Sequence, residues 1–167
     1  MEALKEKILK DAETSRVIVF FDMDGVCAEY GSEDVAGIKN NEPGLFLKKR
    51  PIKSVIATMR ELSENENIQV KILSNCNYLE QKQDKLTWLT THADFIKPEN
   101  INIILLKEET YDEDTKDFIK CRRIKKILAD THEEDSKVYL IEDDHGIINA
   151  TNKDATVKAE HISTLLN

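Results

Sequence analysis

A run of five apolar residues, Val17–Phe21, constrains the fold of this chain more than any other feature of its sequence. The run contains only valine, isoleucine and phenylalanine, and it is too short for a typical helix. Continuous apolar runs of this length are typical of strands that are buried on both faces. The run stops at Asp22-Met23-Asp24-Gly25, which places two carboxylates directly after a buried strand. We therefore expect a central strand with a polar site at its end.

The rest of the chain alternates between strand and helix patterns. We expect further strands at residues 68–73, 101–106, 138–141 and 156–158, and helices at residues 2–13, from Pro51 to Leu62, around Trp88, around Ile124 and at the C-terminus. Strands that alternate with helices indicate a parallel sheet covered on both faces. The predicted fold is therefore α/β, a Rossmann-like three-layer sandwich with a mostly parallel sheet. The length of 167 residues fits a single domain, 1–167, in which the irregular segment 28–50 is a small insertion.

Charge and cysteine content exclude several classes of protein. The net charge is −8, which argues against binding to duplex nucleic acid but leaves room for a small anionic substrate. The three cysteines include no CxxC pair, so neither a disulfide framework nor a zinc knuckle is expected. No apolar run approaches the ~20 residues of a membrane span, and the first residues lack the apolar core of a signal peptide. We expect a cytoplasmic protein without a membrane partner.

Polar residues stand at the ends of three of the expected strands. Asp22 and Asp24 follow the first strand, Ser74 and Asn75 the second, and Glu142-Asp143-Asp144 the fourth. In a parallel sheet these ends meet at one edge, where ligands bind. Clustered carboxylates repel each other, and a divalent cation relieves that repulsion. Magnesium prefers oxygen ligands, which Asp22, an acid from 142–144 and the main-chain carbonyl of Asp24 could supply.

The same residues have a common chemistry. A carboxylate such as Asp22 can attack phosphorus and form an aspartyl-phosphate. Asp24 could protonate the leaving oxygen and then deprotonate the attacking water, while Ser74 and a lysine hold the phosphate. Each motif alone also has an ordinary interpretation: Asp-x-Asp-Gly as a turn or calcium-loop fragment, Ser74-Asn75 as a helix cap, and 142–144 as a solvated loop. Their order and their placement at strand ends favour the catalytic interpretation.

These motifs resemble those of the haloacid dehalogenase-like hydrolase superfamily. Phe21-Asp22-Met23-Asp24-Gly25-Val26 is similar to its first motif, Ile72-Leu73-Ser74-Asn75 to its second and Leu140-Ile141-Glu142-Asp143 to its fourth. The resemblance extends over residues 17–152. It implies that Asp22 is the nucleophile, that Asp24 is the acid and base, and that Asp22, Asp24, Glu142 and Asp143 hold Mg²⁺. An alternative register of the last motif gives Asp143-Asp144.

A closer resemblance is to the 5'(3')-deoxyribonucleotidase-like branch of this superfamily. It rests on Pro43-Gly44-Leu45-Phe46, Arg50-Pro51-Ile52 and Lys85-Leu86-Thr87-Trp88-Leu89. It implies that Lys85 is the phosphate-binding lysine, with Lys82 and Lys97 as alternatives, and that Ser74 and Asn75 also contact the substrate. The sequence departs from that branch in its short cap segment, 28–50, and in the acidic loop and helix within residues 107–137.

The expected function is a magnesium-dependent phosphomonoester hydrolase that acts on a small phosphorylated substrate, with a 5'-nucleotidase as the narrower hypothesis. Two other classes remain open. A phosphorylatable, receiver-like protein uses similar residues, although its acid pair precedes its acceptor aspartate along the chain. A catalytically idle, metal-binding interaction protein would use the acidic stretch 108–117 as a docking surface. The basic run Lys48-Lys49-Arg50 either attracts a nucleotide phosphate or polynucleotide end or forms an exposed approach to the next helix.

Overall fold

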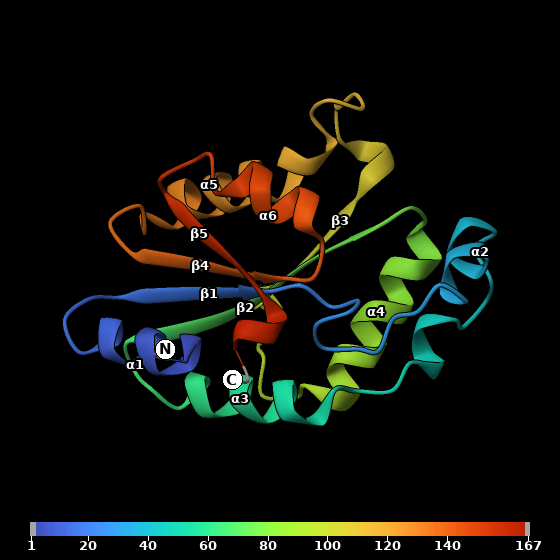
Figure 1. Ribbon diagram of the computed structural model, residues 1–167. Coiled ribbons are helices and arrows are strands. Elements are labelled where there is room, and N and C mark those ends of the chain that lie inside the picture. The colour runs from blue at the N-terminus through green and yellow to red at the C-terminus, as the bar shows by residue number, and fades with distance from the viewer. Residues whose placement is uncertain (1–2, 166–167) are drawn as a thin grey trace.

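The structure, a computed structural model, describes residues 3–165, and its centre is a five-stranded sheet in the order β3-β2-β1-β4-β5 (Figure 1). The strands are β1 (Val17–Phe21), β2 (Ile68–Cys76), β3 (Ile101–Leu105), β4 (Lys137–Glu142) and β5 (Val157–His161). Each pair of neighbouring strands is parallel. The sheet is thus parallel across all the described strands, and β1 is its central strand.

Helices cover both faces of this sheet, which confirms the predicted α/β three-layer sandwich. The helices α1 (Leu4–Ala12), α3 (Lys53–Ser63) and α4 (Leu79–His92) lie on one face, and α5 (Ile119–Thr131) and α6 (His145–Thr151) on the other (Figure 1). Short 3-10 helices connect the elements at η2 (Pro98–Asn100), η3 (Leu106–Glu108) and η4 (Lys116–Phe118). Among residues 3–165, no helix is both long enough and apolar enough to cross a membrane.

The central position of β1 explains its continuous apolar sequence. Val17, Val19 and Phe21 face the core beneath α1 and α3, while Ile18 and Phe20 face the core beneath α5. Successive side chains of a strand point to opposite faces, and helices cover both faces of this sheet. All five residues are therefore fully buried. Burial of each such side chain contributes roughly 1.5–3 kcal/mol relative to exposure.

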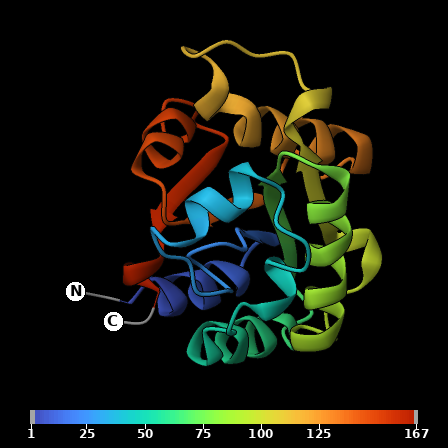
Figure 2. The same ribbon diagram turned by 90° about the vertical axis from the view of Figure 1, so that its right-hand side faces the viewer.

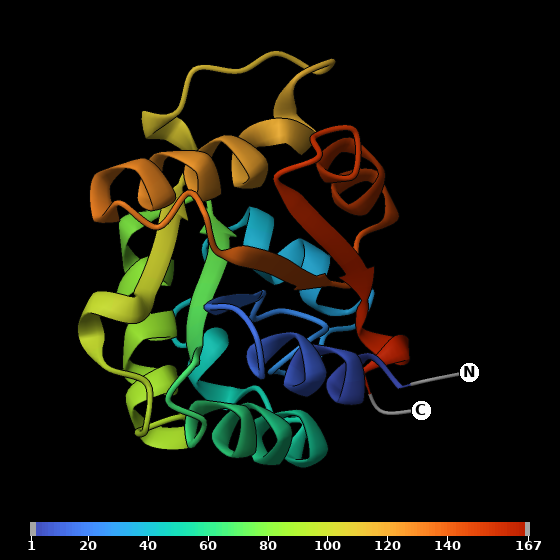
Figure 3. The ribbon, with the colours of Figure 1, turned by 90° about the vertical axis from the view of Figure 1, so that its left-hand side faces the viewer.

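Three local expectations were wrong. The second strand does not end before Ser74 and Asn75, because both residues remain paired with β3 inside β2. Pro51 does not begin a helix: it forms a bridge with Ala28, and α3 starts at Lys53. After β5, the helix expected at the C-terminus is, within the described residues, only the 3-10 helix η5 (Ile162–Thr164), which lies beside α1 (Figure 3).

The segment 28–50, expected to be irregular, contains short helices and is anchored to α4, and its identity as an insertion stays a prediction. It contains α2 (Asp34–Lys39) and the 3-10 helix η1 (Phe46–Lys48), and it lies over the carboxyl ends of the strands (Figure 2). The Nε2 atom of Gln81 on α4 donates to the carbonyl of Ile38 (2.7 Å), and the indole of Trp88 donates to the carbonyl of Lys49 (2.8 Å). Helix α4 therefore holds both halves of this segment in place.

An ion-pair network ties α1 to β4 at the opposite end of the sheet. Lys137 Nζ lies 2.7 Å from Asp11 Oδ1, and the hydroxyl of Tyr139 donates to Asp11 Oδ2 (2.5 Å). Burial alone would raise the pKa of Asp11, but the hydrogen bonds from Lys137 and Tyr139 outweigh it and lower that pKa to about 2. This carboxylate therefore stays ionised far below neutral pH.

Candidate active site

Polar side chains from three parallel strands meet at one edge of the sheet. Asp22 follows β1 directly, and its N–H donates to the carbonyl of Ile141 (3.0 Å), which continues the pairing of β1 with β4. Ser74 lies within β2, and Glu142 is the last residue of β4. The predicted strand-end residues line one cavity of about 710 Å³, together with Tyr30 and residues at the start of α6. The convergence inferred from the three motifs is therefore present.

The acidic part of this cavity is a cluster of three carboxylates. Oxygen atoms of Asp22, Glu142 and Asp143 all lie within 4.8 Å of one another. Asp144 has a different place: its carboxylate accepts hydrogen bonds from the N–H groups of Gly146 (2.7 Å) and Ile147 (3.2 Å) and caps α6. Of the two registers left open for the last motif, the geometry favours Glu142-Asp143.

A buried lysine that the sequence reasoning missed lies inside this cluster. Lys120 on α5 is 2% exposed; its Nζ atom donates to Glu142 Oε2 (2.5 Å) and lies 2.9 Å from Asp22 Oδ1. One signal could have found it, because Lys120, Ile124 and Leu128 are spaced four residues apart on a single helical stripe that faces the core. A lysine on an otherwise apolar stripe indicates a buried ion pair.

The charges of this cluster shift the pKa values of its members in opposite directions. Burial raises the pKa of Asp22, but Lys120 and Lys85 outweigh that effect, and the net pKa is below its usual value. Burial and the negative charge of Asp22 raise the pKa of Glu142 despite Lys120, and the pKa of Asp143 is also raised, chiefly by burial. Asp22 is therefore held as a carboxylate, whereas Glu142 and Asp143 take up protons more readily than ordinary acids.

Gly25 makes room for the carboxylate of Asp143. Gly25 has φ +74°, and a Cβ atom at this position would lie 2.1 Å from Asp143 Oδ2. Positive φ and lack of space both favour glycine here. The first and last motifs are therefore in direct contact through a close approach of the backbone to the acid.

Asp24 and Ser74 line the same cavity, and both contact the predicted phosphate-binding lysine, Lys85, which does not itself line it. Lys85, which is fully buried, donates through its Nζ atom to Asp24 Oδ2 (2.6 Å), Ser74 Oγ (2.9 Å) and the carbonyl of Asn75 (2.7 Å). Lys82 and Lys97, the two alternative candidates for the phosphate-binding lysine, are less buried than Lys85. Lys82 is half-buried and Lys97 is exposed. Lys85 reaches the site because it shares a buried helical stripe of α4 with Trp88 and Leu89.

The cluster fits a hard divalent cation such as Mg²⁺. Its donors are carboxylate oxygens, and one lysine faces three acids. Both oxygens of Glu142 already accept hydrogen bonds, Oε2 from Lys120 and Oε1 from the N–H groups of Asp143 and Asp144, so Asp22 and Asp143 offer the more open oxygens. The side chain of Asp24 is held by Lys85, and a contribution from its main-chain carbonyl stays a prediction.

Comparisons with known proteins show a similar fold in a solved structure, but they assign no family. None of the family models compared with the chain matches it, and no curated protein matches it. Among solved structures, the chain is similar to a protein in the structure of the Pnkp1/Rnl/Hen1 RNA repair complex, with a TM-score of 0.62 and 13% sequence identity. The match covers 89% of this chain and 42% of that chain, so this chain spans less than half the length of the protein it matches. At this identity the likeness concerns the fold alone.

Proposed function

We propose that this protein is a magnesium-dependent phosphomonoester hydrolase of the haloacid dehalogenase-like type, which transfers the phosphoryl group of its substrate to Asp22. One observation carries the proposal. Asp22 lines one cavity together with Lys120, Glu142 and Asp143 and with Asp24 and Ser74, and the last two both contact the buried Lys85. The cavity thus combines a candidate nucleophile, a candidate acid and base, a metal-binding acid cluster and a lysine, and the buried Lys85 contacts two of its lining residues.

In the first step, a carboxylate oxygen of Asp22 attacks phosphorus. A bond forms between Asp22 and phosphorus, the bond from phosphorus to the ester oxygen breaks, and protonated Asp24 gives its proton to that leaving oxygen. The lowered pKa of Asp22 supports its role, because the attacking group must be ionised. Phosphate bound at Ser74 and Lys85 would compete with Asp24 for the ammonium group and separate Asp24 from its ion pair.

In the second step, Asp24 takes a proton from water as the water attacks phosphorus. The bond between phosphorus and Asp22 breaks, inorganic phosphate leaves, and both aspartates return to their starting states. Bound Mg²⁺ would supply positive charge against the phosphoryl oxygens, held by Asp22 and Asp143 with Glu142 beside them. Lys120 and Lys85 both add positive charge that lowers the pKa of Asp22, which supports a site for an anionic group.

The test is Asp22→Asn, with phosphate release from a panel of phosphomonoesters measured in magnesium and in a chelator. We expect magnesium-dependent release by the wild-type protein and its loss in the variant, with an unchanged circular dichroism spectrum. Asp94→Asn is the control, since Asp94 is an exposed acid paired with Arg60 outside the cavity. Full activity of Asp22→Asn would contradict the mechanism. A stable aspartyl-phosphate on the wild-type protein without turnover would instead favour the receiver-like class.

A further inference from the structure

The two carboxylate oxygens of Asp24 have unequal surroundings. Oδ2 accepts a hydrogen bond from the Nζ atom of Lys85 (2.6 Å). Oδ1 is buried and accepts no hydrogen bond from any residue in the range 3–165. A buried carboxylate oxygen without a donor is costly, so it needs another source of stabilisation. That source is Lys49, whose Nζ atom lies 3.9 Å from Oδ1, too far for a hydrogen bond but close enough for an ion pair.

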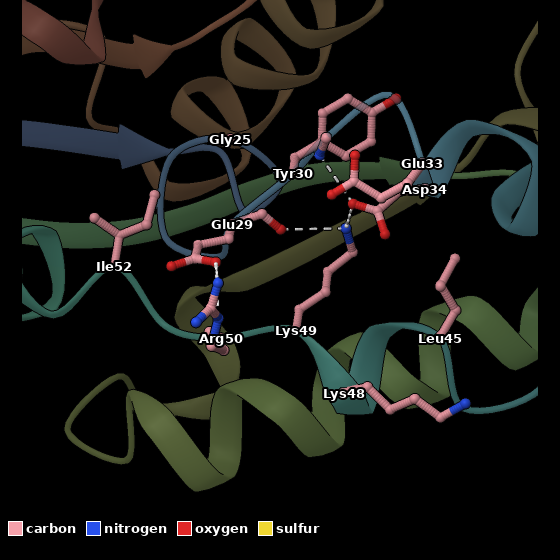
Figure 4. A pocket seen from close by; sticks show the side chains of 11 residues that line it. Gly25, Glu29, Tyr30, Glu33, Asp34, Leu45, Lys48, Lys49, Arg50 and Ile52 are labelled. Atoms are coloured by element: carbon pink, nitrogen blue, oxygen red, sulfur yellow. Dashed lines mark hydrogen bonds and ion pairs between the residues drawn. The ribbon is translucent and has the colours of Figure 1, made fainter.

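Lys49 comes from segment 28–50 and is held by residues of the same segment. Figure 4 shows it beside a second cavity of about 530 Å³, where its Nζ atom donates to Asp34 Oδ2 (2.8 Å) and to the carbonyl of Glu29 (3.3 Å). The ring centre of Tyr30 lies 4.9 Å from the same atom, a cation–π contact. The side chain of Lys49 is only 3% exposed. Its ammonium group is therefore a buried charge with a fixed position.

The two neighbours of Lys49 in the basic run differ from it. Lys48 and Arg50 are exposed, and their ion pairs with Glu42 (3.6 Å) and Glu29 (2.9 Å) lie at the surface. Surface pairs of this kind contribute little to stability. Lys48 and Arg50 thus fit the interpretation of the run as an exposed approach to the next helix, whereas Lys49 turns inward.

Helix α4 sets the position of both lysines that face Asp24. Lys85 belongs to this helix, and Trp88, three residues later, donates from its indole N–H to the main-chain carbonyl of Lys49 (2.8 Å). The ring of Phe46 lies near both ammonium groups, with its centre 4.7 Å from Lys85 Nζ and 5.5 Å from Lys49 Nζ. Each oxygen of Asp24 therefore faces a buried cation, and the two cations share a helix and an aromatic ring.

We propose that Lys49 is a positioning residue for Asp24, which holds Oδ1 in place and leaves Oδ2 to carry the proton. The inference rests on the proposed function, in which Asp24 is the acid and base. When phosphate takes the ammonium group of Lys85, Asp24 loses the hydrogen bond that fixed its side chain. Proton transfer requires the acid within hydrogen-bond reach of the leaving oxygen, and small displacements of such groups are costly. The fixed charge of Lys49 keeps the carboxyl group aimed.

The proton moves only through Oδ2 of Asp24. In the first step it passes from Oδ2 to the leaving oxygen, and in the second step Oδ2 takes a proton from the attacking water. Lys49 keeps its own protons throughout and contacts neither the substrate nor the metal. Because Lys49 belongs to segment 28–50, proton transfer then depends on this segment being in place.

The test compares two esters that differ in their need for a proton. p-Nitrophenolate leaves without protonation, whereas the alkoxide of benzyl phosphate does not. The ratio kcat/KM reports the first step alone, because release of the alcohol is irreversible at initial rates. We expect Lys49→Met to lower kcat/KM at least about tenfold for benzyl phosphate and less than about threefold for p-nitrophenyl phosphate, since general acids contribute roughly 10²–10⁴-fold. Lys49→Arg, which keeps a cation, should recover part of the lost activity.

Asp34→Asn is the matched control for a merely structural role. It breaks the shorter ion pair of Lys49 on the same segment and leaves the cation free for Asp24, so it should not reproduce the selective loss for benzyl phosphate. Lys48→Met is the second control, since Lys48 is exposed and pairs with Glu42. Magnesium affinity, measured by calorimetry, should be the same in all these variants, because none of them changes the acid cluster.

The inference is overturned if Lys49→Met lowers the activity on both esters equally, if it changes neither, or if Asp34→Asn gives the same selective loss. Loss of magnesium binding in Lys49→Met would also overturn it, because the effect would then not act through the side chain of Asp24. These results leave the proposed function intact as long as hydrolysis of both esters requires Asp22. Hydrolysis that persists in Asp22→Asn, or no hydrolysis by the wild-type protein, contradicts the proposed function, and the inference falls with it.

Discussion

Replacement of Lys120 by methionine tests most directly whether this lysine balances the charge of the acid cluster. Methionine has a similar length and helix propensity but no charge, so it can fill the same buried space on α5. The substitution removes the only cation that contacts both Asp22 and Glu142 among the described residues. Three carboxylates then remain within 4.8 Å of one another without a partner inside the cluster.

The size of the effect follows from these distances. Two ionised carboxylates no more than 4.8 Å apart repel each other by at least about 3 kcal/mol at an effective dielectric constant of about 20. Removal of one partner of a buried ion pair generally costs about 3–5 kcal/mol, because the remaining charge stays buried. We expect Lys120→Met to lower the free energy of unfolding by about 3–5 kcal/mol at pH 8 without magnesium.

The loss of unfolding free energy in Lys120→Met should become smaller as the pH falls. Without Lys120, the folded-state pKa values of Glu142 and Asp143, already raised in the wild-type protein, rise further. A carboxyl group whose pKa is raised in the folded state contributes most to stability at low pH, where it is protonated. This contribution to the free energy of unfolding is lost as the pH rises through the folded-state pKa. The deficit of the variant should therefore shrink between pH 8 and pH 5. Magnesium at 100 times its dissociation constant for the variant should raise the variant's free energy of unfolding by about 2.7 kcal/mol.

The assay is urea unfolding, followed by the fluorescence of Trp88, the single tryptophan of the chain, which is buried. Lys125→Met is the matched control on the same helix. Lys125 pairs with Asp154 at 2.7 Å, but its side chain is 52% exposed, so its loss should cost less than about 1 kcal/mol. The reasoning is refuted if Lys120→Met is as stable as the control at pH 8, or if its deficit is the same at pH 5.

Two further predictions concern Gly25 and Asp11. Gly25→Ala should weaken magnesium binding at least about tenfold by calorimetry, because the new Cβ atom would displace the carboxylate of Asp143. Gly44→Ala is its control, with φ +70° but no atom near the new Cβ, and magnesium binding that changes equally in both variants would contradict the prediction. Asp11→Asn should lower stability by about 2 kcal/mol at pH 7, the value of its pKa depression. A carboxylate whose pKa is lowered in the folded state stabilises the fold at any pH above its unfolded-state pKa. The difference in stability between Asp11→Asn and the wild-type protein should therefore vanish as the pH falls from about 4 to about 2. A difference that persists at acid pH would exclude the carboxylate as its cause.

The sequence by itself determined the layer arrangement and the edge at which the site forms. The apolar run 17–21 has no polar position, so it had to be covered on both faces. The alternation of strands and helices then requires parallel strands, and the carboxyl ends of parallel strands meet at one edge. Asp22, Ser74 and Glu142 could therefore be placed together without any knowledge of their contacts.

Local boundaries depended on partners that are distant in sequence. Ser74 and Asn75 resemble a helix cap when considered alone, but β3 extends along β2 far enough to pair with both residues. Pro51 resembles a helix start, but the chain before α3 pairs with the residues that follow Asp24, and the N–H of Ile52 donates to the carbonyl of Cys27 (2.8 Å). In both cases hydrogen bonds between distant segments outweighed the local preference.

Only the tertiary structure decided which lysines enter the site. Lysine and arginine together number 24 in this chain, and a lysine has no sequence pattern that shows whether it is paired inside a core. Lys85 could be selected through its resemblance to a known helix motif, whereas Lys120 had no such motif. Its position depends on how α5 rotates against the sheet, and that rotation is set by the packing of Ile124 and Leu128. The acids of the site are thus placed by the ends of strands, and the cations that balance them by the packing of helices.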